Sequence, residues 1–261
     1  MADTASFGAL ESEKGKLRAT LRSGGPCEEL RSWKTTVRTP NGSLLRSVLL
    51  SKKPAGAPRF EGFPREATRF FAGLAANNNR DWFQANRETY EQAVREPMKA
   101  FVGEFAARFG PAKISRINRD NRFFKDRPPY KTHIDAGVGD YYLSLSSHGF
   151  YVGTGFYMPD SSVLEKFRGA IDRDASGTAL VTMIAGLRRK GYRVDTHERL
   201  ASAPRGYAKD HPRLDLLQMK DIHAGLLMAP DAIATRKLLD RTTKTMTDLK
   251  PFMAWLKRYV G

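Results

Sequence analysis

The densest run of side chains that could bind an anion lies between Lys113 and His133. It holds seven lysines or arginines and two aspartates. Guanidinium groups offer planar pairs of donors that fit phosphate or carboxylate oxygens. In an extended chain Arg116, Asp120 and Arg122 share one face, and Asp120 and Asp126 could orient the guanidinium groups beside them. This spacing predicts a cradle for an anion.

The same residues also fit a plainer interpretation. A basic loop and hairpin joined by surface salt bridges would have this composition, and each such bridge contributes little stability. Composition alone does not choose between the cradle and the solvated surface.

A second candidate segment is the loop from Pro204 to Pro212, which is rich in proline and glycine. It carries Arg205, Lys209, Asp210 and His211. Loops commonly hold functional groups, and an aspartate beside a histidine could serve in acid–base chemistry. An exposed polar turn is the alternative.

Metal and nucleophile signals are weak in this sequence. The five histidines include no pair with the His-x-x-x-His spacing of helical zinc sites. Asp221 and His223 share a strand face and could join Asp210 or His211 at a metal, but two ligands at this spacing are common by chance. We therefore predict no metal site and name no cofactor. The sequence also lacks a P-loop, a Gly-x-Ser-x-Gly motif and a Cys–His arrangement.

Several stretches together resemble a bacterial family called domain of unknown function 2461. The first is Arg116-x-x-Arg119-Asp120-x-Arg122-Phe123, followed by Lys125-Asp126-Arg127 and Tyr130-Lys131. The others are NNNRDWF at 77–83, YVGTGFYMP at 151–159, EKFRGAI at 165–171, and the loop at 204–212. Arg127 stands where the family usually has lysine, which keeps the charge. The resemblance runs from about Phe60 to the C-terminus and implies no reaction. It does imply a shared site made of Arg116, Arg119, Asp120, Arg122, Lys125, Asp126, Tyr130, Lys131, Arg205 and His211.

The elements that must position these residues follow from the hydrophobic pattern. Apolar residues at helical spacing predict a helix after Pro64 and a second from Trp82 to Phe105, which Pro97 should kink or split. Short strands are predicted at 114–119, 130–138, 141–146, 150–157, 192–194 and 219–228. Further helices are predicted at 161–171, 175–187 and from 231 onward, with an interruption at Pro251. Strands joined by short turns indicate an α+β fold: a mainly antiparallel sheet with helices packed on it, an N-terminal helical pair and C-terminal helices.

Residues 1–58 differ in composition from the rest. They are rich in Ser, Thr, Gly and Arg and end in a Pro/Gly segment. We expect a disordered extension, or upstream sequence included by a wrongly chosen start, followed by a single α+β domain at 59–261. The single cysteine and the lack of a long apolar run favour a cytoplasmic protein without a membrane segment.

The charge balance indicates the kind of partner. A net charge of +16 favours anionic partners such as nucleic acid or phosphorylated molecules. Two hypotheses follow. In the first, the domain binds a phosphate-bearing ligand, nucleic acid included, through the 116–131 cluster and Arg205 together. In the second, it is an enzyme acting on such a ligand, with Asp120, Asp126 or His211 as acid, base or metal ligand.

Overall fold

The computed structural model describes residues 59–120, 127–157 and 159–261, which belong to one compact unit bounded at Leu49 and Gly261. The predicted extension at 1–58 lies outside the described residues, as do Arg122, Lys125 and Asp126. None of the helices in these ranges combines the length and the apolar character needed to cross a membrane.

A six-stranded antiparallel sheet forms the centre of the unit, in the order β1-β2-β3-β4-β6-β5. Its strands are β1 Ala112–Ile114, β2 His133–Val138, β3 Tyr141–Ser146, β4 Gly149–Phe156, β5 Arg193–Asp195 and β6 Ile222–Met228. Tight turns join β2, β3 and β4, as the sequence predicts. Every pairing is antiparallel, which confirms the α+β prediction.

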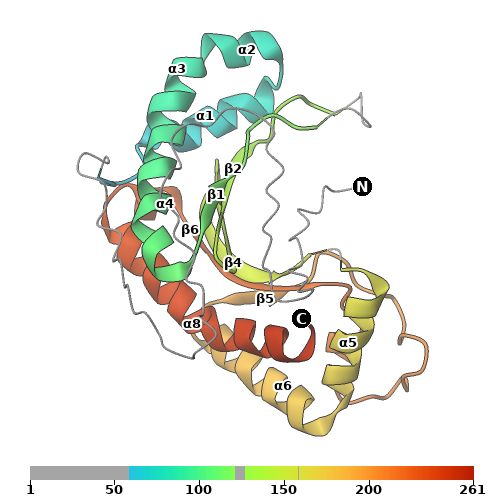
Figure 1. Ribbon diagram of the computed structural model, residues 1–261. Coiled ribbons are helices and arrows are strands. Elements are labelled where there is room, and N and C mark those ends of the chain that lie inside the picture. The colour runs from blue at the N-terminus through green and yellow to red at the C-terminus, as the bar shows by residue number, and fades with distance from the viewer. Residues whose placement is uncertain (1–58, 121–126, 158) are drawn as a thin grey trace, which may run out of the picture. The chain divides into compact units, whose positions relative to one another are not determined.

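The N-terminal helices are α1 Arg65–Ala76, α2 Arg80–Ala85, α3 Arg87–Thr89, the π-helical turn η1 Tyr90–Arg95 and α4 Glu96–Phe109. Of these, α1 and α4 lie against one side of the sheet, and the short segments between them pack on each other and on these two helices (Figure 1). The side chain of Asn79 caps α2 by accepting from the Trp82 N–H at 2.9 Å. The π-helical turn ends at Arg95, two residues before Pro97. Proline lacks an N–H, and its ring collides with the carbonyl four residues back in a regular helix. The wider π-helical turn before Pro97 relieves this clash.

The C-terminal helices pack on the same side of the sheet. They are α5 Ser161–Asp172, α6 Asp174–Arg189, the short α7 Leu214–Leu217, the 3-10 turn η2 Pro230–Ile233 and α8 Lys237–Tyr259. α8 runs unbroken through Pro251, so the predicted interruption is wrong. Leu249, Phe252 and Leu256 are buried on either side of the proline. Packing of this apolar face outweighs the local cost of the proline.

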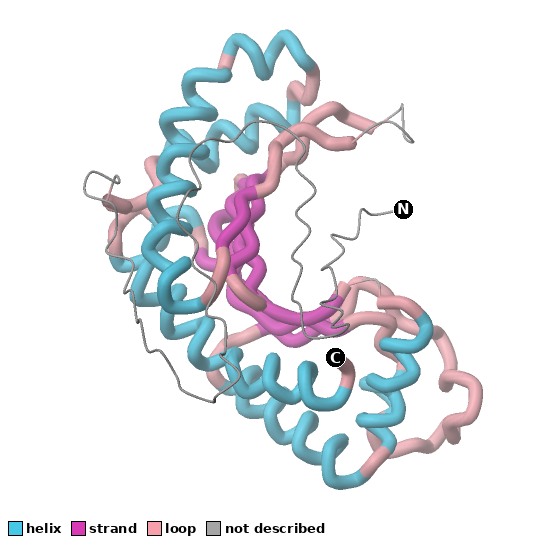
Figure 2. Tube along the Cα trace, viewed as in Figure 1, coloured by secondary structure: helices cyan, strands magenta, loops and turns pink. Residues whose placement is uncertain are grey.

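The core lies between the helices and one face of the sheet. Phe63, Phe101 and Phe150 stand close together, with the Phe101 and Phe150 rings 4.9 Å apart. Along β3, Tyr141, Leu143 and Leu145 are buried toward this core while the residues between them are not. Each fully buried phenylalanine or leucine contributes about 2 kcal/mol. The other face of the sheet carries no helix from the described residues (Figure 2).

Candidate functional site

The sheet face turned away from the helices carries residues that alternate with the core residues. Strand pairing aligns one row across it: Gly137, Tyr142, Gly153, Gly225 and Arg193. A neighbouring row aligns Asp135, Ser144, Tyr151 and Leu227, and a third aligns Gly155, His223 and Asp195. We call this surface the open face.

Two glycines on neighbouring strands make room for a tyrosine ring on the open face. A side chain at Gly153 or Gly225 would collide with the hydroxyl end of Tyr151. The ring therefore lies across both strands and forms the floor of the face. Burial raises the pKa of Tyr151 to about 12, against an opposing effect of Arg193. The hydroxyl thus keeps its proton at neutral pH and can donate a hydrogen bond.

A cavity of about 1030 Å³ opens on this face. Its walls include four tyrosines, three histidines and, at one end, the turn between β2 and β3 with Met253 of α8. Among the described residues, the exposed large hydrophobic side chains are Tyr142, Tyr157, Leu227 and Val181. Tyr142 and Tyr157 line the cavity, and Leu227 belongs to the open face. A smaller hollow of about 410 Å³ lies between α4 and α8, where Arg236 is already paired with Glu104.

A buried carboxylate organises the β2 side of the cavity. Asp135 accepts from Lys131 Nζ at 2.9 Å and from the Tyr142 hydroxyl at 2.8 Å, and lies 2.8 Å from His133 Nε2. Burial acts to raise the pKa of Asp135, but His133, Lys131 and Tyr142 together hold it below its usual value. Lys131, one of the predicted site residues, is therefore connected to the cavity wall through Asp135.

At the opposite side of the cavity, two histidines and an aspartate gather. His197, Asp221 and His223 each place a ligand atom within 4.8 Å of the others. His197 Nδ1 lies 3.0 Å from Asp221 Oδ2, and the two imidazole rings are 4.4 Å apart. Burial, followed by His197 beside it, lowers the pKa of His223. Both histidines line the cavity.

Reasoning from the sequence missed His197 and paired Asp221 and His223 with Asp210 or His211 instead. The strand register explains the difference. Asp195 pairs with His223 across β5 and β6, so continuing this pairing by two residues brings His197 opposite Asp221. The signal lay in the alignment of two distant strands, which a single sequence does not reveal.

The described part of the 116–131 cluster continues beyond the β1–β2 edge of the sheet. Arg119 and Lys131 donate backbone hydrogen bonds to Pro129 and Ile117, and Asn118 bridges to Tyr130. Only residues 112–114 and 133–138 are regular strand, so the predicted strands at 114–119 and 130–138 are longer than the observed ones.

Within this extension, several predicted site residues contact each other. Arg116 lies 3.6 Å from Asp120, and Arg119 Nε donates to the Tyr130 carbonyl at 3.0 Å. The Tyr130 ring is buried and stacks on Phe83 with 4.1 Å between centroids. Asn78 bonds both backbone groups of Tyr130. The Tyr130 side chain thus belongs to the core.

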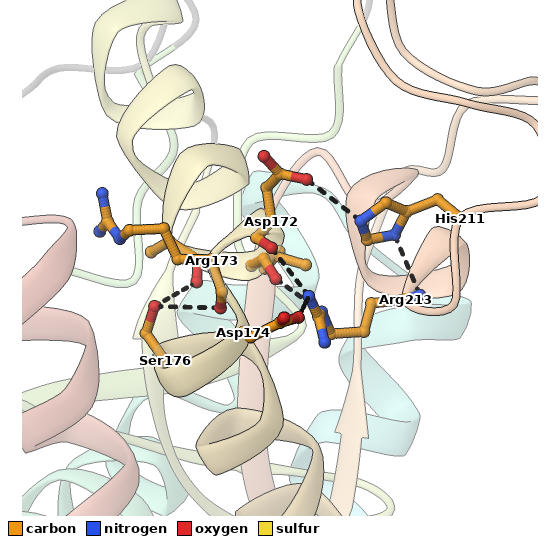
Figure 3. Close-up of polar contacts among 8 residues, drawn as sticks. Asp172, Arg173, Asp174, Ser176, His211 and Arg213 are labelled. Atoms are coloured by element: carbon orange, nitrogen blue, oxygen red, sulfur yellow. Dashed lines mark hydrogen bonds and ion pairs between the residues drawn. The ribbon is translucent and has the colours of Figure 1, made fainter.

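The loop at 204–212 packs on the junction of α5 and α6, as Figure 3 shows. His211 Nε2 lies 3.2 Å from Asp172 Oδ1, and its Nδ1 accepts from the Arg213 N–H at 3.0 Å. Arg213 donates to the Ile171 and Asp172 carbonyls and to Asp174. Both ring nitrogens of His211 are thus engaged within the protein. We call His211, Arg213, Asp172 and Asp174 the junction clamp.

The described parts of the two predicted segments do not meet. The 116–131 segment extends from the β1–β2 edge, whereas the 204–212 loop follows β5 at the other edge and packs on α5. Figure 1 shows them at opposite ends of the sheet. The expectation that Arg205 shares one site with Arg116 and Asp120 is therefore wrong.

Comparison with known proteins places this fold in a family. Residues 66–255 match the family described as "Conserved hypothetical protein (DUF2461)". The chain belongs to this family. The DUF2461 match confirms the resemblance seen in the motifs and spans α1 to most of α8, so it contains both the open face and the junction clamp. A search of the curated proteins found no match.

Proposed function

We propose that this DUF2461 domain binds a ligand that combines a phosphate group with a planar ring, such as a nucleotide or single-stranded nucleic acid, on its open face. The observation that carries the proposal is the gathering of exposed aromatic rings at a cavity. Tyr142 is 44% exposed and Tyr157 is 61% exposed, and both line the cavity beside Tyr151. Nucleobases stack on such rings without regard to sequence.

Donors for the phosphate lie on the same surface. Arg193 stands opposite Gly225 in the strand register, and its charge acts on the nearby Tyr151 hydroxyl. Tyr151 and Arg193 can both donate to a phosphate oxygen, and Lys131 adds positive charge at the β2 side. The net charge of +16 attracts such a ligand over longer distances. With one cysteine in the chain, we place this binding in a reducing, cytoplasmic compartment.

The geometry favours binding over catalysis by the predicted acid–base residues. Both nitrogens of His211 are engaged in the junction clamp. Asp120 lies beside Arg116 in the extension beyond β1, and neither residue lines the cavity. Asp126 lies outside the described residues. Lys131 is connected to the cavity wall through Asp135, which contacts the lining residues His133 and Tyr142.

The test uses two probes that separate a small nucleotide from a polymer. Adenosine diphosphate is titrated calorimetrically, and a labelled single-stranded oligothymidylate is followed by fluorescence anisotropy, each at about 50 and about 200 mM salt. We expect Arg193→Gln to weaken binding roughly tenfold through the lost charge-assisted bond. Tyr142→Ala should weaken it at least about fivefold through lost stacking, and Tyr142→Phe should not.

Arg189→Gln is the matched control, because it removes the same charge from an exposed position on α6. Binding of the oligonucleotide alone would identify a nucleic acid as the ligand, and binding of both probes a nucleotide-sized site. The proposal is wrong if neither probe binds at low salt, or if Arg189→Gln weakens binding as much as Arg193→Gln.

A further inference from the structure

The group formed by His197, Asp221 and His223 has no role in the ligand binding proposed above. It brings two imidazoles and one carboxylate to one side of the cavity, with a ligand atom of each within 4.8 Å of the others. We propose that these three residues bind a divalent first-row transition-metal ion, with zinc as the representative. This inference does not depend on the identity of the organic ligand.

Asp221 is held in position for such a role. It is 3% exposed, and its Oδ1 accepts from the His197 N–H at 2.8 Å and lies 2.9 Å from Thr196 Oγ1. The other oxygen, Oδ2, faces the His197 ring. Hydrogen bonds to one oxygen of a ligating carboxylate fix its orientation, as around known metal sites. The buried Asp221 carboxylate is thus already oriented to bind a metal ion.

His223 supplies an independent observation that points to a ligand. Its Nδ1 is buried and has no hydrogen-bond partner. Among the side chains of the described residues, the Thr242 hydroxyl is the one other buried polar group without a partner. A buried polar atom without a partner costs about 1–3 kcal/mol, so such atoms are uncommon in native folds. The His223 ring also lies beside the His197 ring, with 4.4 Å between their centroids. A metal ion is a partner that two adjacent imidazoles can share.

The donor set defines the class of ion. Two imidazole nitrogens and one carboxylate oxygen suit zinc, iron, cobalt and related ions, whereas magnesium and calcium prefer oxygen alone. Donors of a tetrahedral zinc ion lie about 3.3 Å apart, given bonds of about 2.0–2.1 Å. The three ligand atoms must therefore move closer together to bind zinc. The His197 side chain, which is 53% exposed, has room to move.

Three protein ligands leave a coordination position open. Because His197 and His223 line the cavity, that position would be reached from the cavity. Tyr157, whose ring contacts His197 edge-on at 4.7 Å, borders the same place. A bound ion could thus hold a water molecule or an anionic group of a ligand.

The experiment titrates the metal-free full-length protein with Co²⁺ and follows the visible absorption that cobalt gains from protein ligands. Zn²⁺ should displace Co²⁺ and abolish the signal, and Mg²⁺ should not. We expect one Co²⁺ per chain, bound at least about tenfold more weakly by His197→Ala and by His223→Gln. Asp221→Asn, which keeps the side-chain shape, should weaken binding similarly.

The three histidines outside the group, His133, His148 and His211, can serve as controls, because all of them lie within the described residues. His211→Ala is the matched variant, since it removes a histidine that also faces an aspartate. It should bind Co²⁺ like the unchanged protein. The inference fails if no absorption develops at about 1 mM Co²⁺, or if His211→Ala loses the signal while His223→Gln keeps it.

Discussion

Two histidine–aspartate pairs in this domain have opposite exposure. In the junction clamp, the His211 side chain is 12% exposed and its partner Asp172 is 55% exposed. On the open face, the side chain of His197 is 53% exposed and the side chain of its partner Asp221 is 4% exposed. The first pair buries its imidazole and points its carboxylate to solvent. The second buries its carboxylate and presents its imidazole to a cavity.

This difference separates a structural pair from a candidate binding group. The clamp uses both nitrogens of His211 and three donors of Arg213 to join the loop to α5 and α6. At the open face, the carboxylate is fixed by the backbone while His223 keeps a buried nitrogen without a partner. Sequence reasoning favoured His211, because it stands beside Asp210 in the loop at 204–212 that shares the family resemblance.

The largest expected effect is on the clamp. Arg213→Ala should lower the free energy of unfolding by about 3 kcal/mol, because it leaves the Ile171 and Asp172 carbonyls without their donor and empties a tightly packed site. The Arg213 side chain is only 10% exposed and closely approaches Gly177. Urea denaturation measures the change.

The exposed Arg205 of the same loop is the control for this prediction, and Arg205→Ala should change stability by less than about 0.5 kcal/mol. Co²⁺ binding by Arg213→Ala should stay unchanged. A loss of metal binding in this variant would contradict the separation of the two regions.

A smaller effect is expected from removing the buried carboxylate of the open face. Asp221→Ala should cost about 2 kcal/mol in metal-free buffer, because the partly buried hydrogen bond from the His197 N–H loses its acceptor. Asp172→Ala should cost less than about 0.5 kcal/mol, since exposed ion pairs contribute little. Equal costs for the two variants, measured by urea denaturation with a chelator present, would remove the contrast between the pairs.

The smallest effect is a pH dependence on the β2 side of the cavity. The pKa of Asp135 is lower in the folded protein than its ordinary value of 3.8, so the folded state binds fewer protons near that pH. The stability it contributes is present above about pH 4 and is lost as pH falls through the lowered folded-state pKa. Asp135→Asn should therefore cost about 1 kcal/mol at pH 6 and less at pH 3, by urea midpoints. A cost that grows on acidification would reverse the sign and refute the assignment.

Much of the fold could be read from local patterns. The stripe Ala67, Phe70, Phe71 and Leu74 predicts α1, and all four are buried. The alternation along Tyr141–Ser146 predicts a strand with one buried face, as observed. These patterns work because burial on one side of a helix or strand is encoded in residues three, four or two positions apart.

The proline predictions show where local rules stop. Pro251 lies inside α8 because flanking apolar residues pack on the sheet, an energy that no short window of sequence contains. Pro97 is accommodated by the π-helical turn that ends two residues before it.

For the candidate site too, local sequence determined one part and the tertiary structure another. The sequence by itself determined the residue types: basic side chains, scattered histidines, and Asp221 and His223 on one strand face. Only the tertiary structure decided which of them meet, because the β5–β6 register brings His197 opposite Asp221 and the same sheet keeps Arg205 at the far edge from Arg116. Residues far apart in a chain become neighbours through strand pairing and packing, and the energy that selects one pairing is spread over the whole core.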